Sequence, residues 1–318
     1  MLAPSVETRL ALDKTPVMTL QRELKDFPWP KPFASTAVPV WTGHGFRVGE
    51  VHHAFLNFGA EESHWSPDLT QLHEAEAGST HPIDRASRKL AVRSLRHFVS
   101  TKVPIILDIG CSSGFLLEEI RNCLPQAALV GSDYIASPLV RLIERMPNLP
   151  ILQFDLRKCP LPDNCVDAVT VLNVLEHVDR DEEALRQIYR ILRPGGIAHI
   201  EVPAGPHLYD IYDEHLMHHR RYRLSNLMIM TERVGFEIVR ATHLGFFVYP
   251  AFWIVKKRNR RRLMARENRR GAETVRTQIR STRDSRIMEV LMKTEVLLFP
   301  IISFPIGIRC VLVGRKPL

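Results

Sequence analysis

The sequence lacks the features that mark exported, membrane-spanning and disulfide-linked proteins. Its five cysteines are odd in number and contain no C-x-x-C pair, which disfavours both a disulfide framework and a zinc ribbon. Residues 1–17 are interrupted by charges, so no secretory signal is expected. The uncharged segment at residues 296–308 has thirteen residues and two prolines, against the ~20 residues needed to span a bilayer. We therefore expect a cytoplasmic protein.

Excess charge is confined to one segment. The 318 residues include 43 Lys and Arg and 35 Asp and Glu, a formal net charge of +8. The segment that begins at Lys256 and ends at Arg270 (KKRNRRRLMARENRR) holds nine basic residues and one acidic residue, so the remainder of the chain is neutral. A solvated helix face is the plainest interpretation, but the aromatic and apolar segments on either side favour contact with an anionic membrane, peripheral on its inner face. Nucleic acid is disfavoured as a partner, because no stacking aromatics lie within the segment.

Short apolar segments alternate with helical ones from about Pro82 onwards. Strands are expected at residues 103–110, 127–133, 151–155, 166–174 and 196–203, and helices between them at residues 115–123, 138–146 and 182–192. Short apolar strands separated by helices of about ten residues are typical of a parallel sheet covered on both faces. The pattern predicts a doubly wound α/β domain.

Four segments follow from this pattern. Residues 1–80 are interpreted as an N-terminal extension, of which the first fifty residues show no sustained period and are expected to be loosely structured. Residues 81–244 form the α/β core, and residues 309–318 form its final strand. Residues 245–308, which depart from simple alternation, are expected to form a helical insertion that serves as a lid or a membrane-facing platform.

A glycine-containing turn follows the first predicted strand of the core, in the segment LDIGCSSG at residues 107–114. In an open parallel sheet, such a turn lets backbone amides approach a ligand at the carboxyl ends of the strands. The dinucleotide fingerprint G-x-G-x-x-G is absent, because Ser112 stands between Gly110 and Gly114 and an acid, Asp108, precedes the first glycine. A carboxylate here would repel a pyrophosphate but suits a ligand with ammonium and sulfonium groups. The turn therefore argues against NAD.

Polar residues also end the next three strands. Asp133 ends the second strand, about where nucleotide-binding folds place a carboxylate on the ribose. Asp155, followed by Leu156, ends the third and would offer an acceptor and an apolar wall to an adenine. The fourth ends in NVLEHV, which places Asn173 at the rim of the same site.

The segments LDIGCSSG, FDL, LNVLEHV and LRPGG, together with the acid that ends the second strand, resemble in this order the small-molecule class I S-adenosylmethionine-dependent methyltransferases. The resemblance covers about residues 82–244 and implies a Rossmann-like sheet, mostly parallel with an antiparallel last strand, and S-adenosyl-L-methionine as cofactor. Ser112 departs from the commoner glycine of the family. The cofactor-binding residues implied are Asp108, Gly110, Cys111, Ser112, Gly114, Asp133, Asp155, Leu156 and Asn173.

The segment after the fifth strand, residues 210–222, should lie over the mouth of this site. Its HHRRY motif resembles bacterial methyltransferases linked to glycan or lipid pathways. The catalytic candidates are His218, His219 and Asp213, and the alternative is that these histidines only order the loop. No metal site is expected. Glu176 and His177 are interpreted as a structural pair at the end of the fourth strand.

The sequence thus predicts an enzyme that methylates a small or lipid-linked acceptor, with a saccharide oxygen as one candidate. Nucleobases are disfavoured as acceptors, because no Asp/Asn-Pro-Pro-aromatic tetrad follows the fourth strand. A nicotinamide-dependent oxidoreductase is disfavoured by Asp108 and Ser112. A non-catalytic scaffold that recruits a membrane or a partner is the remaining alternative.

Overall fold

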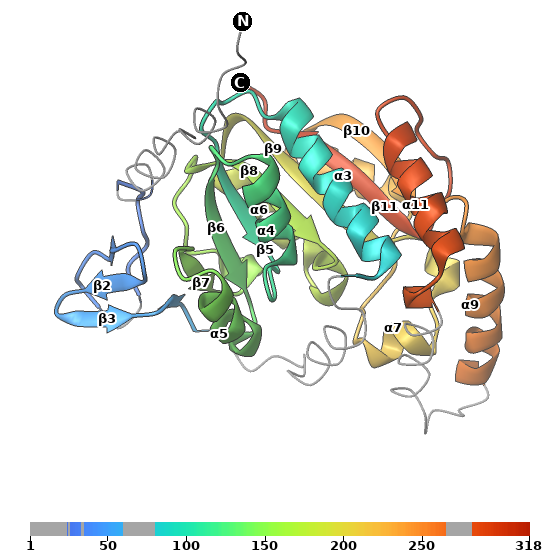
Figure 1. Ribbon diagram of the computed structural model, residues 1–318, viewed down its shortest axis with the longest axis horizontal. Helices are drawn as coiled ribbons and strands as arrows, with labels where there is room; N and C mark the ends of the chain where they lie inside the picture. Colours follow the sequence, from blue (N-terminus) through green and yellow to red (C-terminus); the bar gives the residue numbers. More distant parts are fainter. Residues whose placement is uncertain (1–23, 25, 33–34, 60–79, 265–281) are drawn as a thin grey trace, which may run out of the picture.

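The computed structural model describes residues 24, 26–32, 35–59, 80–264 and 282–318 (Figure 1). Parts of the N-terminal extension, of the basic segment and of the expected insertion therefore lie outside the described residues.

An eight-stranded sheet, in the order β10-β11-β9-β8-β5-β6-β7-β4, forms the centre of the described structure. The strands from β4 to β9 pair in parallel, whereas β11 is antiparallel to both of its neighbours, β9 and β10. This arrangement confirms the predicted fold class of a mostly parallel sheet with an antiparallel last strand. The strand bounds are β4 (Leu56–Asn57), β5 (Ile105–Ile109), β6 (Ala128–Asp133), β7 (Ile151–Gln153), β8 (Val166–Leu172), β9 (Leu192–Pro203), β10 (Glu237–Leu244) and β11 (Arg309–Arg315).

Helices cover both faces of this sheet (Figure 1). In the central strand β5, Leu107 packs in a buried cluster with residues of α6 and α8, whereas Ile106 packs with residues of α3, α4 and α5 on the opposite face. A strand buried on both faces needs apolar side chains in succession, which accounts for the continuous segment IILDI. The helix bounds are α3 (Pro82–Phe98), α4 (Phe115–Cys123), α5 (Ala136–Arg145), α6 (Asp181–Ile191) and α8 (Leu224–Val234).

The N-terminal segment is more ordered than its sequence predicts. Three short strands, β1 (Val40–Trp41), β2 (Phe46–Val48) and β3 (Val51–His53), form a separate antiparallel sheet, and β4 adds to the edge of the main sheet beside β7. The small sheet is held by aromatic side chains, since the rings of Trp29 and Trp41 each lie 4.9 Å from the ring of Phe46. The expectation of loose structure is therefore wrong for this part of the extension, because burial of these rings supplies the order that periodicity does not reveal.

Two described helices lie between the last two strands, α9 (Tyr249–Met264) and α11 (Arg286–Leu298). They occupy the same side of the molecule in Figure 1, where α11 runs beside α3 and α9 beside the short helix α7 (Ile211–His215). Both are short of the length and apolarity required to cross a bilayer, as are the other described helices.

Candidate active site

The carboxylate of Asp108 lies at the end of β5, with only 3% of the residue exposed. Thr170, its neighbour in register on β8, donates a 2.6 Å hydrogen bond from Oγ1 to Asp108 Oδ1. Burial raises the pKa of Asp108 to about 7, and the negative charge of Asp133 acts in the same direction. An acid in this environment gains most from a cationic ligand, which would stabilise its ionised form.

The turn after β5 depends on residues with positive φ. Gly110 has a φ of +74°, and a Cβ built on it would lie 2.3 Å from Cγ2 of Val174. Gly114 has a φ of +80°, and a Cβ there would lie 2.3 Å from Cδ1 of Leu142. Ser112 adopts a left-handed φ of +47°, the conformation that the family's commoner glycine would take without cost. The backbone of the turn is therefore set by close packing against two neighbouring elements.

Cys111 contributes to this turn through its backbone. Its side chain is buried, and burial raises the pKa of the thiol well above its usual range. The backbone N–H of Cys111 and that of Gly110 both donate to the carbonyl oxygen of Ser132, at 2.9 and 2.8 Å. These bonds join the turn to β6.

Asp133 ties the same two elements together through its side chain. Its Oδ2 accepts a 2.9 Å hydrogen bond from the backbone N–H of Ser112, and its Oδ1 accepts one of 2.9 Å from the N–H of Ile135. These donors hold the carboxylate at the carboxyl end of β6, beside the turn, and its expected role at a ribose remains a prediction.

Asp155 has a strong partner that sequence reasoning missed. Its carboxylate caps a short helix, η2 (Leu156–Lys158), by accepting from the N–H of Arg157, and Nη2 of the same arginine lies 2.6 Å from Asp155 Oδ2. Burial would raise the pKa of Asp155, but the hydrogen bonds and charge of Arg157 outweigh burial and lower it. The role of Asp155 and Leu156 at adenine remains a prediction.

The structure brings three of the predicted cofactor residues to one edge of the sheet. Asn173 follows β8 with a φ of +54°, and its N–H donates a 2.8 Å hydrogen bond to the carbonyl oxygen of Glu201. Because β8, β5 and β6 are adjacent parallel strands, Asn173, Asp108 and Asp133 all lie at their carboxyl ends. Ligands of open α/β sheets bind at this edge.

A buried ionic cluster lies beside α7. Asp210 and Asp213 form a reciprocal capping box at the start of this helix, and both side chains are fully buried. Arg221 Nε lies 2.8 Å from Asp213 Oδ1, and Asn259 donates a 3.0 Å hydrogen bond to Asp210 Oδ2. Two carboxylates in the interior require such partners, because an unpaired buried charge costs several kcal/mol.

Lys256, the first residue of the basic segment, belongs to this cluster. Its Nζ lies 2.6 Å from Asp210 Oδ1 and 3.1 Å from Asp213 Oδ2, and only 3% of the residue is exposed. The predicted membrane contact through Lys256 is therefore wrong, because this side chain neutralises two buried acids. Of the remaining basic residues, the exposed ones with described side chains are Lys257, Arg258, Arg260 and Arg261.

The three catalytic candidates differ in exposure. Asp213 is buried, and although burial alone would raise its pKa, Lys256 and Arg221 hold the pKa well below its usual range. His218 is also buried, with Nδ1 2.8 Å from Asp213 Oδ1, and burial lowers its pKa. His219 is exposed. A catalytic role for any of them remains a prediction, and Asp213 is placed to orient His218.

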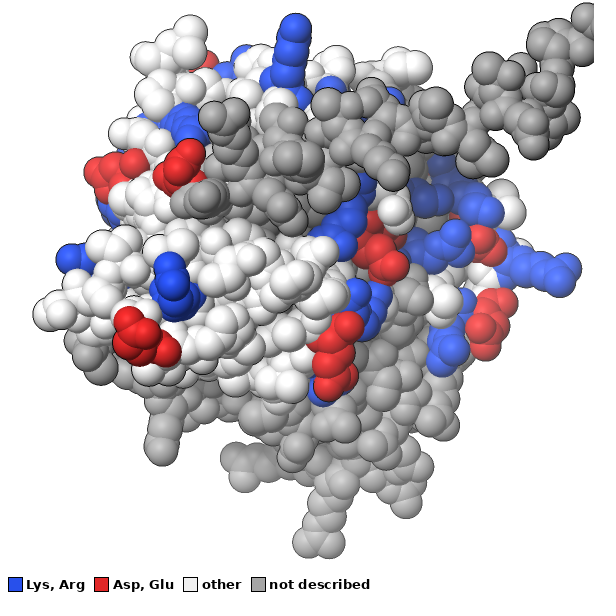
Figure 2. Space-filling model, turned by 60° about the vertical axis from the view of Figure 1, so that its left-hand side comes forward, with Lys and Arg blue, Asp and Glu red and all other residues white. Residues whose placement is uncertain are grey.

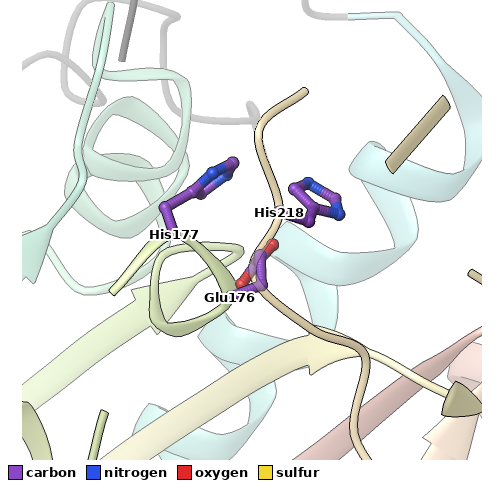
Figure 3. Close-up of side chains that lie close together, drawn as sticks. All are labelled: Glu176, His177 and His218. Carbon is purple, nitrogen blue, oxygen red and sulfur yellow. The ribbon is translucent and has the colours of Figure 1, made fainter. Parts of the chain in front are cut away.

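Glu176 and His177 lie close to His218 (Figure 3). They form the short helix η3 (Leu175–His177), which follows β8. Glu176 is fully buried, and burial raises its pKa to about 8. From the sequence, Glu176 and His177 are expected to form a structural pair and His218 is a separate catalytic candidate, and no sequence signal indicates that the fold brings the three together.

Comparison with known proteins agrees with the fold just described. Residues 107–200 match the family described as "Methyltransferase domain". Together with the sheet order, this match supports a class I methyltransferase fold for the part of the chain that contains these residues.

The chain is similar to a Mycolicibacterium smegmatis protein named a probable S-adenosylmethionine-dependent methyltransferase, with 28% identity over 135 residues that cover 42% of this chain and 52% of the relative. It is also 33% identical over 118 residues to the ubiquinone/menaquinone biosynthesis C-methyltransferase of Ectopseudomonas mendocina, covering 34% of this chain and 46% of that protein. The chain thus spans about half the length of the curated relatives it matches.

A solved structure shares the fold. Phosphoethanolamine N-methyltransferase 2 of Haemonchus contortus, in complex with S-adenosyl-L-methionine, superimposes with a TM-score of 0.51 at 13% identity, covering 79% of this chain and 60% of that one. This likeness concerns the fold alone, and S-adenosylmethionine as cofactor is supported by the matched domain and by the name of the first relative.

Proposed function

We propose that this protein transfers the methyl group of S-adenosylmethionine to a small or lipid-linked acceptor. The observation that carries the proposal is the alignment of Asp108, Asp133 and Asn173 at the carboxyl ends of three adjacent parallel strands. The acid at Asp108 suits the positively charged amino acid end of the cofactor, and the acid at Asp133 suits the hydroxyls of its ribose.

The reaction needs little covalent chemistry from the protein. A lone pair of the acceptor attacks the methyl carbon in line with the carbon–sulfur bond, and the bonding electrons leave with sulfur to give a neutral thioether. Alignment of the two reactants supplies most of the acceleration, and a base is needed only for an acceptor that still carries its proton. In this proposal the turn from Gly110 to Gly114, whose two glycines have φ of +74° and +80°, would hold the donor against the sheet.

A lipid-linked acceptor is supported by the exposed surface of α9. Trp253, Ile254 and Val255 are exposed, with Ile254 62% accessible, and Lys257 lies 4.6 Å from the ring centroid of Trp253. Apolar and cationic side chains on one helix suit an anionic membrane surface, where each Lys or Arg contributes about 1 kcal/mol. Figure 2 shows another face of the molecule, on which described Lys and Arg side chains lie beside Asp and Glu side chains. Such mixed charges would not attract an anionic surface.

Label transfer tests the reaction and the kind of acceptor together. Protein would be incubated with S-adenosylmethionine labelled in its methyl group and with a bacterial cell extract, which is then divided into organic and aqueous phases. Label in the organic phase supports a lipid-linked acceptor, and label in the aqueous phase supports a small one. The Asp133→Ala variant should lose transfer to both, whereas Asp163→Ala, an exposed acid far from the turn in sequence, should retain it. If the protein binds S-adenosylmethionine but transfers no label to either phase, the result argues for the scaffold alternative.

Vesicle flotation tests the membrane surface separately. Wild-type protein should float with phosphatidylglycerol vesicles at low salt and release as salt is raised. Exchange of Ile254 and Lys257 for Ser and Glu should weaken flotation, while Arg186→Glu on the exposed side of α6 should not. Wild-type protein that stays with the unbound fraction at low salt excludes this surface.

A further inference from the structure

Two segments that are distant in sequence meet at Glu176, His177 and His218. Each of these residues offers a ligand atom within 4.8 Å of the others, and the two imidazole rings lie 4.7 Å apart at 75°. The backbone N–H of His219 donates a 2.8 Å hydrogen bond to the carbonyl oxygen of Glu176, which fixes one segment against the other. Figure 3 shows the three side chains gathered at this junction, with the carboxylate of Glu176 below the two rings.

Glu176 is the unexplained member of this group. Its side chain is fully buried, yet neither carboxylate oxygen has a hydrogen-bond partner within the part of the chain that the structure describes. Buried polar groups are nearly always satisfied, so an orphaned carboxyl in the interior calls for a ligand or a function. The ligand atoms of the two imidazoles lie within 4.8 Å of the Glu176 carboxyl, and neutral imidazole binds metal cations.

His218 is oriented as a histidine ligand of a metal would be. Its Nδ1 lies 2.8 Å from Oδ1 of Asp213, a carboxylate that is ionised because it also pairs with Arg221 and Lys256. An ionised carboxylate only accepts, so Nδ1 must donate, and the lone pair of neutral His218 therefore lies on Nε2. A histidine that donates one ring N–H to a carboxylate while its other nitrogen faces a ligand site is the arrangement found around bound metals.

We propose that Glu176, His177 and His218 bind a divalent transition-metal ion, for which Zn²⁺ is the natural probe. Two imidazoles and one carboxylate are one of the donor sets of catalytic zinc sites, which keep a fourth position for water or substrate. This inference goes beyond the proposed methyl transfer and differs from the expectation, made from the sequence, that there is no metal site. A ligand role for His218 also replaces the role of base that the sequence suggested for it.

The position of the site gives the metal a use in the proposed reaction. Glu176 follows Asn173 by three residues on the same chain segment, so the cluster lies close to the expected methyl donor. A hydroxyl oxygen of the acceptor in the fourth position would lose its proton to solvent more readily, because a bound metal lowers the pKa of its oxygen ligands. The resulting oxyanion would attack the methyl carbon as the carbon–sulfur bond breaks.

Metal titration of the full chain tests the site without any need for methyl transfer. Protein stripped with a chelator would be titrated with Zn²⁺ in competition with a chromophoric chelator, and with Co²⁺ followed by its visible absorption. We expect one tight site per chain. Changes to residues that only support a metal ligand typically weaken metal affinity by roughly 10–100-fold. Because Glu176 and His177 would bind the metal directly, Glu176→Gln and His177→Ala should each weaken Zn²⁺ binding by more than that. His219→Ala, the exposed neighbouring histidine, should bind as the wild type does.

The controls separate loss of the site from loss of the fold. Each variant would be compared with the wild type in its urea midpoint and in its binding of S-adenosylhomocysteine, both of which should be retained by Glu176→Gln because the amide keeps the size of the carboxyl. Absence of a stoichiometric site in the wild type, or unchanged Zn²⁺ affinity in both ligand variants, overturns the proposal. Metal binding without methyl transfer would support this site and count against the proposed function alone.

Discussion

Thr170 Oγ1 donates a 2.6 Å hydrogen bond to Oδ1 of the buried Asp108, and this contact joins the carboxyl ends of β8 and β5. Burial nevertheless raises the pKa of Asp108 to about 7. We therefore predict that cofactor binding depends on pH through the charge of Asp108.

Cofactor affinity should fall as pH is lowered below about 7, by up to about tenfold per pH unit, because the ionised form of Asp108 binds the cationic ligand. Above that pH the affinity should level off. Calorimetric titration with S-adenosylhomocysteine from pH 5.5 to 8.5 measures this dependence. Asp108→Asn should bind more weakly and lose this part of the pH dependence, while Asp163→Asn keeps it. A wild-type affinity that is flat across pH 7 contradicts the role of Asp108.

The turn should tolerate no side chain at Gly110. Alanine there combines a φ of +74° with a Cβ placed 2.3 Å from Val174, so we expect a loss of about 2–4 kcal/mol in unfolding free energy and of cofactor binding. Gly59→Ala is the matched control, since φ is +64° and a Cβ there meets nothing within 4 Å. Urea denaturation of both variants separates backbone strain from the clash. Equal losses would show that packing against Val174 is unimportant.

Removal of Lys256 should destabilise the protein far more than removal of its neighbour. Lys256→Ala leaves Asp210 and Asp213 with an uncompensated buried charge, for which we expect a cost of about 3–5 kcal/mol. Lys257→Ala, at an exposed position, should change stability by less than about 0.5 kcal/mol. Thermal and urea unfolding provide the comparison, and similar stabilities for the two variants would argue against the buried cluster.

Acid should weaken the fold through His199. This side chain is fully buried on β9 beside Ser94, and burial lowers its pKa from 6.5 to about 3. The contribution of neutral His199 to stability is therefore present above pH 6.5 and is lost as pH falls towards 3, at about 1.4 kcal/mol per pH unit. His199→Gln should reduce the slope of unfolding free energy against pH between 6.5 and 5. His97→Gln, an exposed control, should leave the slope unchanged, and an identical slope for both variants would refute this assignment.

Local patterns predict much of this fold. The expected helix at residues 115–123 coincides with α4, and the helix expected at residues 182–192 lies within one residue of α6. Both helices are predicted from the periodicity of their apolar residues and from acidic residues near their N-termini, which are local features of the sequence. The turn from Asp108 to Gly114 is likewise local.

The remaining features depend on residues that meet only after folding. The segment around Lys256 has the composition of a solvated basic helix, yet this lysine is buried because two acids lie 43 and 46 residues earlier in the chain. The pairing of β4 with β7 similarly depends on contacts across almost a hundred residues. The approach of His218 to Glu176 requires the fold of two loops, and no spacing in the sequence indicates it.

The central claim is that the edge formed by Asp108, Asp133 and Asn173 binds S-adenosylmethionine. Calorimetric titration of the wild-type chain with S-adenosylhomocysteine and, separately, with NAD tests it most directly. We expect one S-adenosylhomocysteine to bind per chain, that binding to be lost in Asp133→Ala, and NAD not to bind. Tight binding of NAD alone would contradict it.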